Sequence, residues 1–203
     1  YDDIIEFGAV RYTSRFELLD EFNFFIKSDK KLSKFTLESS NITEEDVMSG
    51  KDIKTALKMI KEIFSDSIIV AHNAYFDYDF INEKLEENGM EKIKNPVIDT
   101  LPLARFLFPD YKSYREESIA KNLGLSFSSS SAHRANYDAM HLAEIFFIML
   151  PMLFEINKDM RHKDIGEFKY TEDVLMSLHP YHVILLAKNQ NSLKDLYKIG
   201  SDV

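Results

Sequence analysis

An apolar run that passes directly into a polar string limits the possible folds of this chain more than any other feature. Ile68-Ile69-Val70 is short and β-branched, which is typical of a buried strand, and apolar residues at helical spacing follow the polar string. The pattern predicts a strand over residues 68–73 and a helix over residues 77–88. The polar string between them is His72-Asn73-Ala74-Tyr75-Phe76-Asp77. Since α/β proteins place chemistry where a strand's carboxyl end opens onto a crevice, we expect an α/β fold with a functional site here.

The other apolar patterns predict elements on both sides of this junction. In chain order they are a β-hairpin made of residues 4–12 and 16–26, a helix beginning after Thr43, an amphipathic helix over 52–64, a strand at 97–100 and helices over 101–108, 118–123 and 135–150.

Composition excludes several classes of function. The chain has 203 residues, 45% of them hydrophobic, which is enough for a sizeable core. Its net charge of −9 argues against a surface that coats nucleic acid, although bound divalent cations could reverse the local potential at an active site. The absence of Cys excludes disulfides and thiolate zinc sites. The most apolar stretch, residues 145–154, is too short to span a membrane, so we expect no membrane partner. We expect a cytoplasmic location, since the absence of Cys fits a reducing compartment.

Two aspartates are the first candidates for chemistry. Asp77 ends the first polar string, and Asp138 ends a second one, His133-Arg134-Ala135-Asn136-Tyr137-Asp138, which opens the last long helix. Either Asp alone could simply cap a helix. However, each follows a His by the same interval, and carboxylates brought together repel one another unless a cation lies between them. We therefore expect Asp77 and Asp138 to face one another across a site for Mg²⁺ or Mn²⁺.

The polar residues near these aspartates have two interpretations each. His133, on a Ser-rich approach to the helix, is suited to act as a general base, but a surface or capping role is equally consistent with its spacing. His72 and Asn73 could bind substrate, yet hydrogen bonding that holds the turn is the favoured interpretation.

The two strings also resemble known motifs. His72-Asn73-Ala74-x-Phe76-Asp77 resembles the second motif of the DEDD-type 3′–5′ exonucleases, and His133-x-Ala135-x-x-Asp138 resembles their third motif in its His-bearing form. Residues 97–109 are similar to the proofreading domain of PolC-type DNA polymerase III. Residues 180–198 are similar to the segment that follows that domain, where the polymerase chain re-enters its PHP domain.

The resemblance implies a fold, an activity and a set of site residues. The implied fold is ribonuclease H-like, a mixed sheet flanked by helices, and the implied reaction is two-metal hydrolysis of the 3′-terminal phosphodiester during proofreading. Asp77 and Asp138 would bind Mg²⁺ or Mn²⁺, His133 would be the catalytic base, and Asn73 and Phe76 would contact substrate. The implied partners are the primer 3′ end of DNA, the remainder of the polymerase chain and the replisome.

One departure from the family pattern affects what the chain can do alone. The family's first motif, Asp-x-Glu on the first and central strand, is absent from the sequence and is expected upstream of Ile4. We therefore expect an exonuclease domain over residues 1–155 that lacks its first strand and is inactive alone. A connector over 156–178 and the start of a PHP-like segment over 179–203 would follow.

Two other functions remain open on the sequence: a free-standing DEDD exonuclease that trims RNA, and a degenerate exonuclease fold without catalysis. His179 and His182 could belong to a PHP metal site or form ordinary hydrogen bonds.

Overall fold

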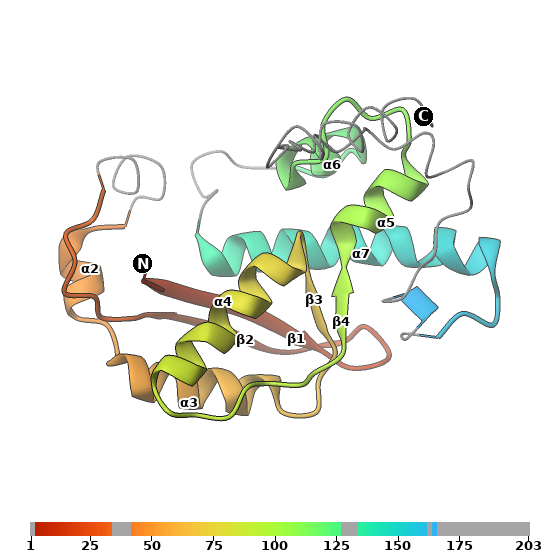
Figure 1. The fold of residues 1–203 in the computed structure, drawn as a ribbon. Helices are drawn as coiled ribbons and strands as arrows, with labels where there is room; N and C mark the ends of the chain where they lie inside the picture. The colour runs from red at the N-terminus through yellow and green to blue at the C-terminus, as the bar shows by residue number, and fades with distance from the viewer. Residues whose placement is uncertain (1–2, 34–41, 127–133, 162–163, 166–203) are drawn as a thin grey trace, which may run out of the picture.

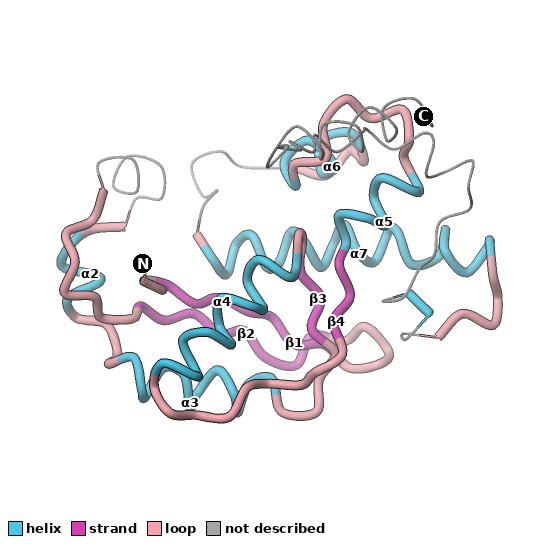
Figure 2. Tube along the Cα trace, viewed as in Figure 1, coloured by secondary structure: helices cyan, strands magenta, loops and turns pink. Residues whose placement is uncertain are grey.

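The computed structural model describes residues 3–33, 42–126, 134–161 and 164–165 of the chain. The predicted tail segment at 179–203, with His179 and His182, lies outside these residues, as does most of the expected connector. The elements, shown in Figures 1 and 2, are β1 (Glu6–Tyr12), β2 (Leu18–Phe25), α2 (Glu44–Met48), α3 (Ile53–Phe64), β3 (Ile69–Ala71), α4 (Ala74–Glu87), β4 (Val97–Asp99), α5 (Thr100–Leu107), α6 (Glu116–Asn122) and α7 (Ala135–Ile156).

The predicted hairpin is confirmed as the antiparallel pair β1–β2. Glu6 lies opposite Phe25 at its open end, and Tyr12 lies opposite Leu18 near the turn. One face of the hairpin is aromatic, because the rings of Phe7 and Phe24 lie 5.2 Å apart between centroids. This face packs into a core with α3 and α4, in which Leu57, Ile60 and Leu85 are fully buried. Each such side chain stabilises the fold by about 1.5–3 kcal/mol through burial.

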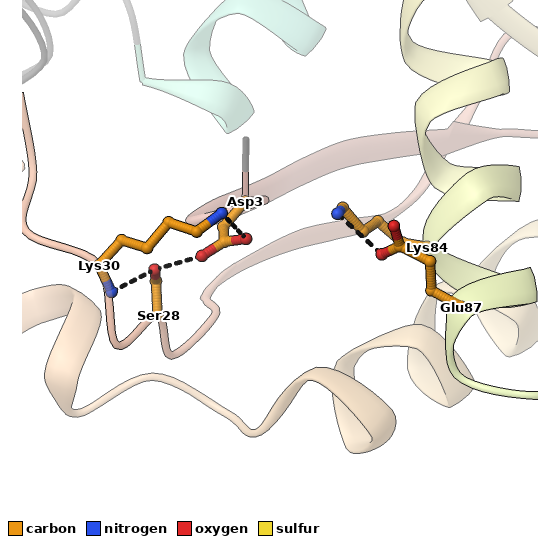
Figure 3. Close-up of polar contacts among 5 residues, drawn as sticks. All are labelled: Asp3, Ser28, Lys30, Lys84 and Glu87. Atoms are coloured by element: carbon orange, nitrogen blue, oxygen red, sulfur yellow. Dashed lines mark hydrogen bonds and ion pairs between the residues drawn. The ribbon is translucent and has the colours of Figure 1, made fainter. Parts of the chain in front are cut away.

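Polar contacts hold the open end of the hairpin (Figure 3). The Asp3 carboxylate, just before β1, accepts a hydrogen bond of 2.7 Å from the Ser28 hydroxyl and one of 2.8 Å from the Lys30 ammonium. From α4, the Lys84 side chain extends toward Asp3 and donates to Glu87 at 2.9 Å. The segment that leads into β1 is therefore joined to the segment that leaves β2.

The strands β3 and β4 form a short parallel pair in which Ile69 lies opposite Val97. The prediction of a buried strand over residues 68–73 was too long, because β3 has three residues and each is only half-buried. The chain leaves the strand early because Asn73 adopts a left-handed conformation (φ 60°), and α4 then begins at Ala74 rather than at residue 77. Within the described residues the predicted mixed sheet consists of these two pairs, with no hydrogen-bonded strand joining them.

The helices were predicted in the right order, with differences at their ends. Thr43 caps α2 in a capping box with Asp46, and Gly124 follows α6 with the expected positive φ of 76°. The last helix continues to Ile156, beyond the predicted end at residue 150. Pro151 does not end it, because that residue lies on the exposed side while Leu153 anchors the next turn in the core.

In Figure 1 the helix α7 passes behind α5, above the hairpin β1–β2 in this view. By length and composition alone, its 22 residues could cross a membrane, so the sequence-based estimate of residues 145–154 was too short. However, α7 packs against β1, α5 and α6, and Ile145, Met149 and Leu153 are almost fully buried. These contacts are those of a core helix in a globular protein.

Candidate active site

Asp77 lies in the first turn of α4, directly after the left-handed turn at Asn73. The turn is held from the neighbouring strand, because the Asn73 backbone N–H donates to Asp99 Oδ1 at 2.9 Å. The same carboxylate oxygen accepts from the Leu101 N–H at 2.9 Å and so caps α5. Asp99 thus ties the carboxyl ends of β3 and β4 together and sets the direction in which α4 leaves the sheet.

The His72 side chain links the end of β3 to the start of α5 and to the loop before α6. Its Nδ1 lies 2.9 Å from the Thr100 hydroxyl oxygen, and its Nε2 lies 2.7 Å from the Tyr114 carbonyl oxygen. Since a carbonyl can only accept, we assign the hydrogen to Nε2, and Nδ1 then accepts from Thr100. Burial lowers the pKa of His72, which favours this neutral form. The interpretation of His72 as a residue that holds the turn is therefore confirmed.

Asp138 lies in the first turn of α7, and its backbone N–H donates to the Arg134 carbonyl at 3.0 Å. The N-cap residues of α4 and α7 are Asn73 and Arg134. Neither Asp77 nor Asp138 is therefore a helix N-cap, which removes the simplest structural explanation for the two aspartates.

A third carboxyl group, on Glu116 at the start of α6, lies within electrostatic range of both aspartates. Its Oε1 atom is buried and has no hydrogen-bond partner among the described residues. Burial of the side chain, together with the negative charges of Asp138 and Asp77, raises the pKa of Glu116 to about 8. Asp77 and Asp138, 61 positions apart in the sequence, therefore both lie close enough to act on the same carboxyl group.

Sequence reasoning missed Glu116, because no motif surrounds it and its helix is short. The only available signal was its place at the start of the helix before the Ser-rich segment that leads to the second polar string. The pKa of Asp77 is also raised, by burial and by a neighbouring negative charge. Although Asp77 is accessible to solvent on one side, surrounding protein and the charge of Asp99 raise its pKa.

These carboxyl groups suit a divalent cation in their chemistry. The Glu116 Oε1 atom is buried without a hydrogen-bond partner among the described residues, and the neighbouring carboxyl groups disfavour ionisation of one another. A bound hard cation would accept the oxygen as a ligand and offset the repulsion between the negative charges. In the described part of the chain, no three His, Asp or Glu side chains lie close enough to form a complete ligand set. The residues present therefore fit part of a metal site.

The other predicted site residues have different outcomes. Phe76, next to Asp77, is 72% exposed, and Asn73 is exposed at the preceding turn. Both are exposed residues close to Asp77 in the chain, and their predicted contact with substrate stays a prediction. His133 lies outside the described residues, one position before the N-cap of α7.

Comparison with known proteins gives the geometry a context. The model of the exonuclease family (RNase_T) matches residues 1–146. The PolC-type DNA polymerase III of Ureaplasma parvum is 39% identical to this chain over 202 residues, which are 99% of the chain and 14% of that protein. The corresponding protein of Bacillus subtilis is 35% identical, again over 99% of this chain and 14% of its own length.

Solved structures agree on the fold. The chain aligns with exonuclease X, solved in complex with 5′-overhanging duplex DNA, at a TM-score of 0.60 and 20% identity, covering 80% of this chain and 89% of that one. It aligns with Escherichia coli exonuclease I, solved with a dA16 oligonucleotide, at a TM-score of 0.62 and 18% identity, covering 75% and 38%. The predicted ribonuclease H-like exonuclease fold is confirmed.

Proposed function

This chain belongs to the exonuclease family, and from that premise we propose that it is the 3′–5′ proofreading section of a bacterial replicative DNA polymerase of the PolC type. The observation that carries the proposal is the match of the exonuclease family model to residues 1–146, which contain both Asp77 and Asp138. The chain spans only 14% of the length of the polymerases that it matches. The polymerase context, the DNA substrate, the replisome partners and a cytoplasmic location are therefore parts of the proposal.

Asp77 and Asp138 are the residues that would hold the metal, with Glu116 beside them. Two Mg²⁺ or Mn²⁺ ions would supply the activation of a water and the stabilisation of the leaving oxygen in phosphodiester hydrolysis. The protein's own contribution is to hold these carboxyl groups together at the ends of three helices. Their mutual repulsion in the free protein disfavours any state in which all three are charged without a cation.

Exposed groups beside Asp77 would receive the primer end. The Phe76 ring is 72% exposed and lies one residue before the aspartate, a position from which it could stack on a terminal base. Stacking of this kind is worth about 1–3 kcal/mol per base and tolerates any sequence, as proofreading requires. Asn73 would add a polar contact from the same turn.

A strand from outside these 203 residues would complete the site. The hairpin β1–β2 and the pair β3–β4 are not hydrogen-bonded to each other in the described residues. We propose that an Asp-x-Glu strand from elsewhere in a longer polymerase pairs between them and supplies the remaining carboxylates. In the same scheme residues 156–178 connect the domain to a PHP-like segment at 179–203.

The extent of the match favours the polymerase over a free-standing RNA exonuclease. The family model ends at residue 146, but the similarity to the Ureaplasma parvum polymerase covers 202 residues. A free-standing trimming enzyme would have no reason to share the additional C-terminal segment. The alternative of a degenerate, non-catalytic module is disfavoured because both motif aspartates, Asp77 and Asp138, are present.

The proposal is tested with the protein at its natural length and a primer with a mismatched 3′ nucleotide, without deoxynucleotides. We expect the primer to shorten one nucleotide at a time in Mg²⁺ or Mn²⁺, to stay intact in EDTA, and to shorten again when metal is restored. Gel electrophoresis of an end-labelled primer follows the reaction. No shortening in either metal, or equal shortening in EDTA, would contradict the proposal.

His133→Ala tests the role of the proposed base. We expect the rate of trimming to fall by about 10²–10⁴-fold, because a general base contributes in this range, and the acidic limb of its pH profile to disappear. Binding of Mn²⁺, measured by electron paramagnetic resonance, should be unchanged. A loss of Mn²⁺ affinity would instead identify His133 as a ligand, and an unchanged rate would remove it from the site.

A further inference from the structure

The first turn of α7, which carries Asp138, is docked on the hairpin β1–β2 through Glu6. The Glu6 side chain is 5% exposed, and its Oε1 accepts from Arg134 Nε at 3.1 Å. Its Oε2 accepts from the Ala135 backbone N–H at 3.3 Å. Since Arg134, the N-cap residue, makes no side-chain capping bond, the Glu6 carboxylate satisfies a helix N–H that would otherwise lack a capping partner. A negative charge at this end of a helix is also favoured by the helix dipole.

Two further contacts define how closely the hairpin and the helix approach. A Cβ on Gly8 would lie 2.2 Å from the Ala135 carbonyl carbon and 2.3 Å from the Asn136 nitrogen, so the absence of a side chain permits the approach. Asn23 Nδ2 donates to Asn136 Oδ1 at 3.3 Å from the second strand. The hairpin therefore contacts three successive residues at the start of α7, and Asp138 follows within the same turn.

The open end of the hairpin β1–β2, where Glu6 lies, is itself fixed by contacts with neighbouring residues. Glu6 lies opposite Phe25 in the strand register, and the Arg134 guanidinium lies 5.3 Å from the centre of the Phe25 ring. Three residues before Glu6, Asp3 is joined to Ser28 and Lys30 (Figure 3). Glu6 therefore lies at a strand end that is fixed by pairing with β2 and by the contacts of Asp3 with Ser28 and Lys30.

We propose that Glu6 is a positioning residue for Asp138: by capping and pairing the first turn of α7, it fixes the Asp138 carboxylate relative to Asp77. This inference rests on the proposed function. In this proposal Glu6 acts through its contacts with Arg134 and Ala135 at the start of the helix. Residues that orient metal ligands in this way change metal affinity or activity by about 10–100-fold when they are replaced.

The test compares Glu6→Ala and Glu6→Gln with Asp20→Asn in the protein at its natural length. Asp20 pairs with Arg11 elsewhere on the same hairpin, so its variant is a matched control for loss of a hairpin carboxylate. For Glu6→Ala we expect kcat for primer trimming to fall by about 10–100-fold with KM within about twofold, and Mn²⁺ to bind more weakly. Hydrogen exchange of the Ala135 to Asp138 amides should become faster, while primer extension is kept.

The conservative variant separates positioning from general loss of structure. Gln at position 6 retains an oxygen that can accept from the Ala135 N–H, so exchange protection and part of kcat should return. In an Arg134→Ala background, Glu6→Ala should have a smaller effect than in the wild type, because the two residues share one interaction. If Glu6→Ala also lowers primer extension, the variant has lost structure in general. The role of Glu6 is then judged from the recovery in Glu6→Gln and from the smaller effect in the Arg134→Ala background.

The outcomes distinguish this inference from the proposed function. If Asp138→Ala abolishes trimming but Glu6→Ala behaves like Asp20→Asn in kcat, Mn²⁺ binding and exchange, Glu6 is not a positioning residue. If Asp138→Ala leaves trimming intact, Asp138 is not part of the site and Glu6 has no ligand to position; if the wild-type protein does not trim in either metal, the proposed function itself is wrong. Faster exchange at Ala135 to Asp138 together with reduced kcat and weaker Mn²⁺ binding supports the inference.

Discussion

Asp138→Ala is expected to reduce trimming of a mismatched primer by about 10³-fold or more while primer extension by the same protein continues. The loss is large because removal of a metal-binding carboxylate takes away charge stabilisation that is needed in the transition state. Asp138 lies in the first turn of α7, where the hairpin holds the helix, and its charge acts on Glu116. Quenched-flow assays of trimming and of extension on one preparation measure both activities.

Glu155→Ala provides the matched control for this variant. Glu155 lies at the other end of the same helix and is exposed, so its loss should leave both activities unchanged. Asp77→Ala should behave as Asp138→Ala does, with Asp79→Ala, an exposed neighbour on α4, as its control. Trimming at the wild-type rate in Asp138→Ala would remove that residue from the site.

The second large effect is a pH dependence of stability that originates at Glu116. Burial and the charges of Asp138 and Asp77 raise the pKa of Glu116 from 4.5 to about 8. The folded protein therefore holds this proton more tightly than the unfolded chain does. In EDTA, the free energy of unfolding should fall as pH rises from about 4.5 to about 8 and stay low above that range. Each unit of pKa difference corresponds to about 1.4 kcal/mol, so the loss is on the order of a few kcal/mol.

Glu116→Gln should abolish most of this dependence. The amide has nearly the shape of the carboxyl group but no charge to bury, so the variant should be more stable than the wild type at pH 8 in EDTA. Glu117→Gln, at the exposed next position, is the control. Hydrogen exchange of the α6 and α7 amides as a function of pH measures local stability. Identical pH dependence in Glu116→Gln and the wild type would contradict the burial of this carboxyl group.

Divalent metal should reduce the same dependence in the wild type. A cation among the carboxyl groups favours their charged forms, so Mn²⁺ should restore stability near pH 8 and have little effect in Asp138→Ala. If Mn²⁺ changes nothing at pH 8 in the wild type, the convergence of Asp77, Asp138 and Glu116 would not be a metal site.

Local features of the fold were readable from the sequence because they depend on neighbouring residues. The capping role of Thr43, the left-handed position of Gly124 and the hairpin of residues 4–26 each follow from side chains within a few positions. Element ends were predicted less well. The helix α4 begins early because Asn73 takes a left-handed turn that Asp99, 26 positions away, holds by a hydrogen bond.

The sequence by itself determined the family, the two motif aspartates and the expectation of a metal between them, because the polar strings around Asp77 and Asp138 are specific in their order and spacing. Only the tertiary structure decided that Glu116 lies within electrostatic range of these aspartates and that Glu6 contacts the start of the helix on which Asp138 lies. Both depend on contacts between segments far apart in the chain. Glu6 and Ala135, for example, are 129 positions apart, and no local pattern encodes such an approach. The packing of α7 against the hairpin creates it.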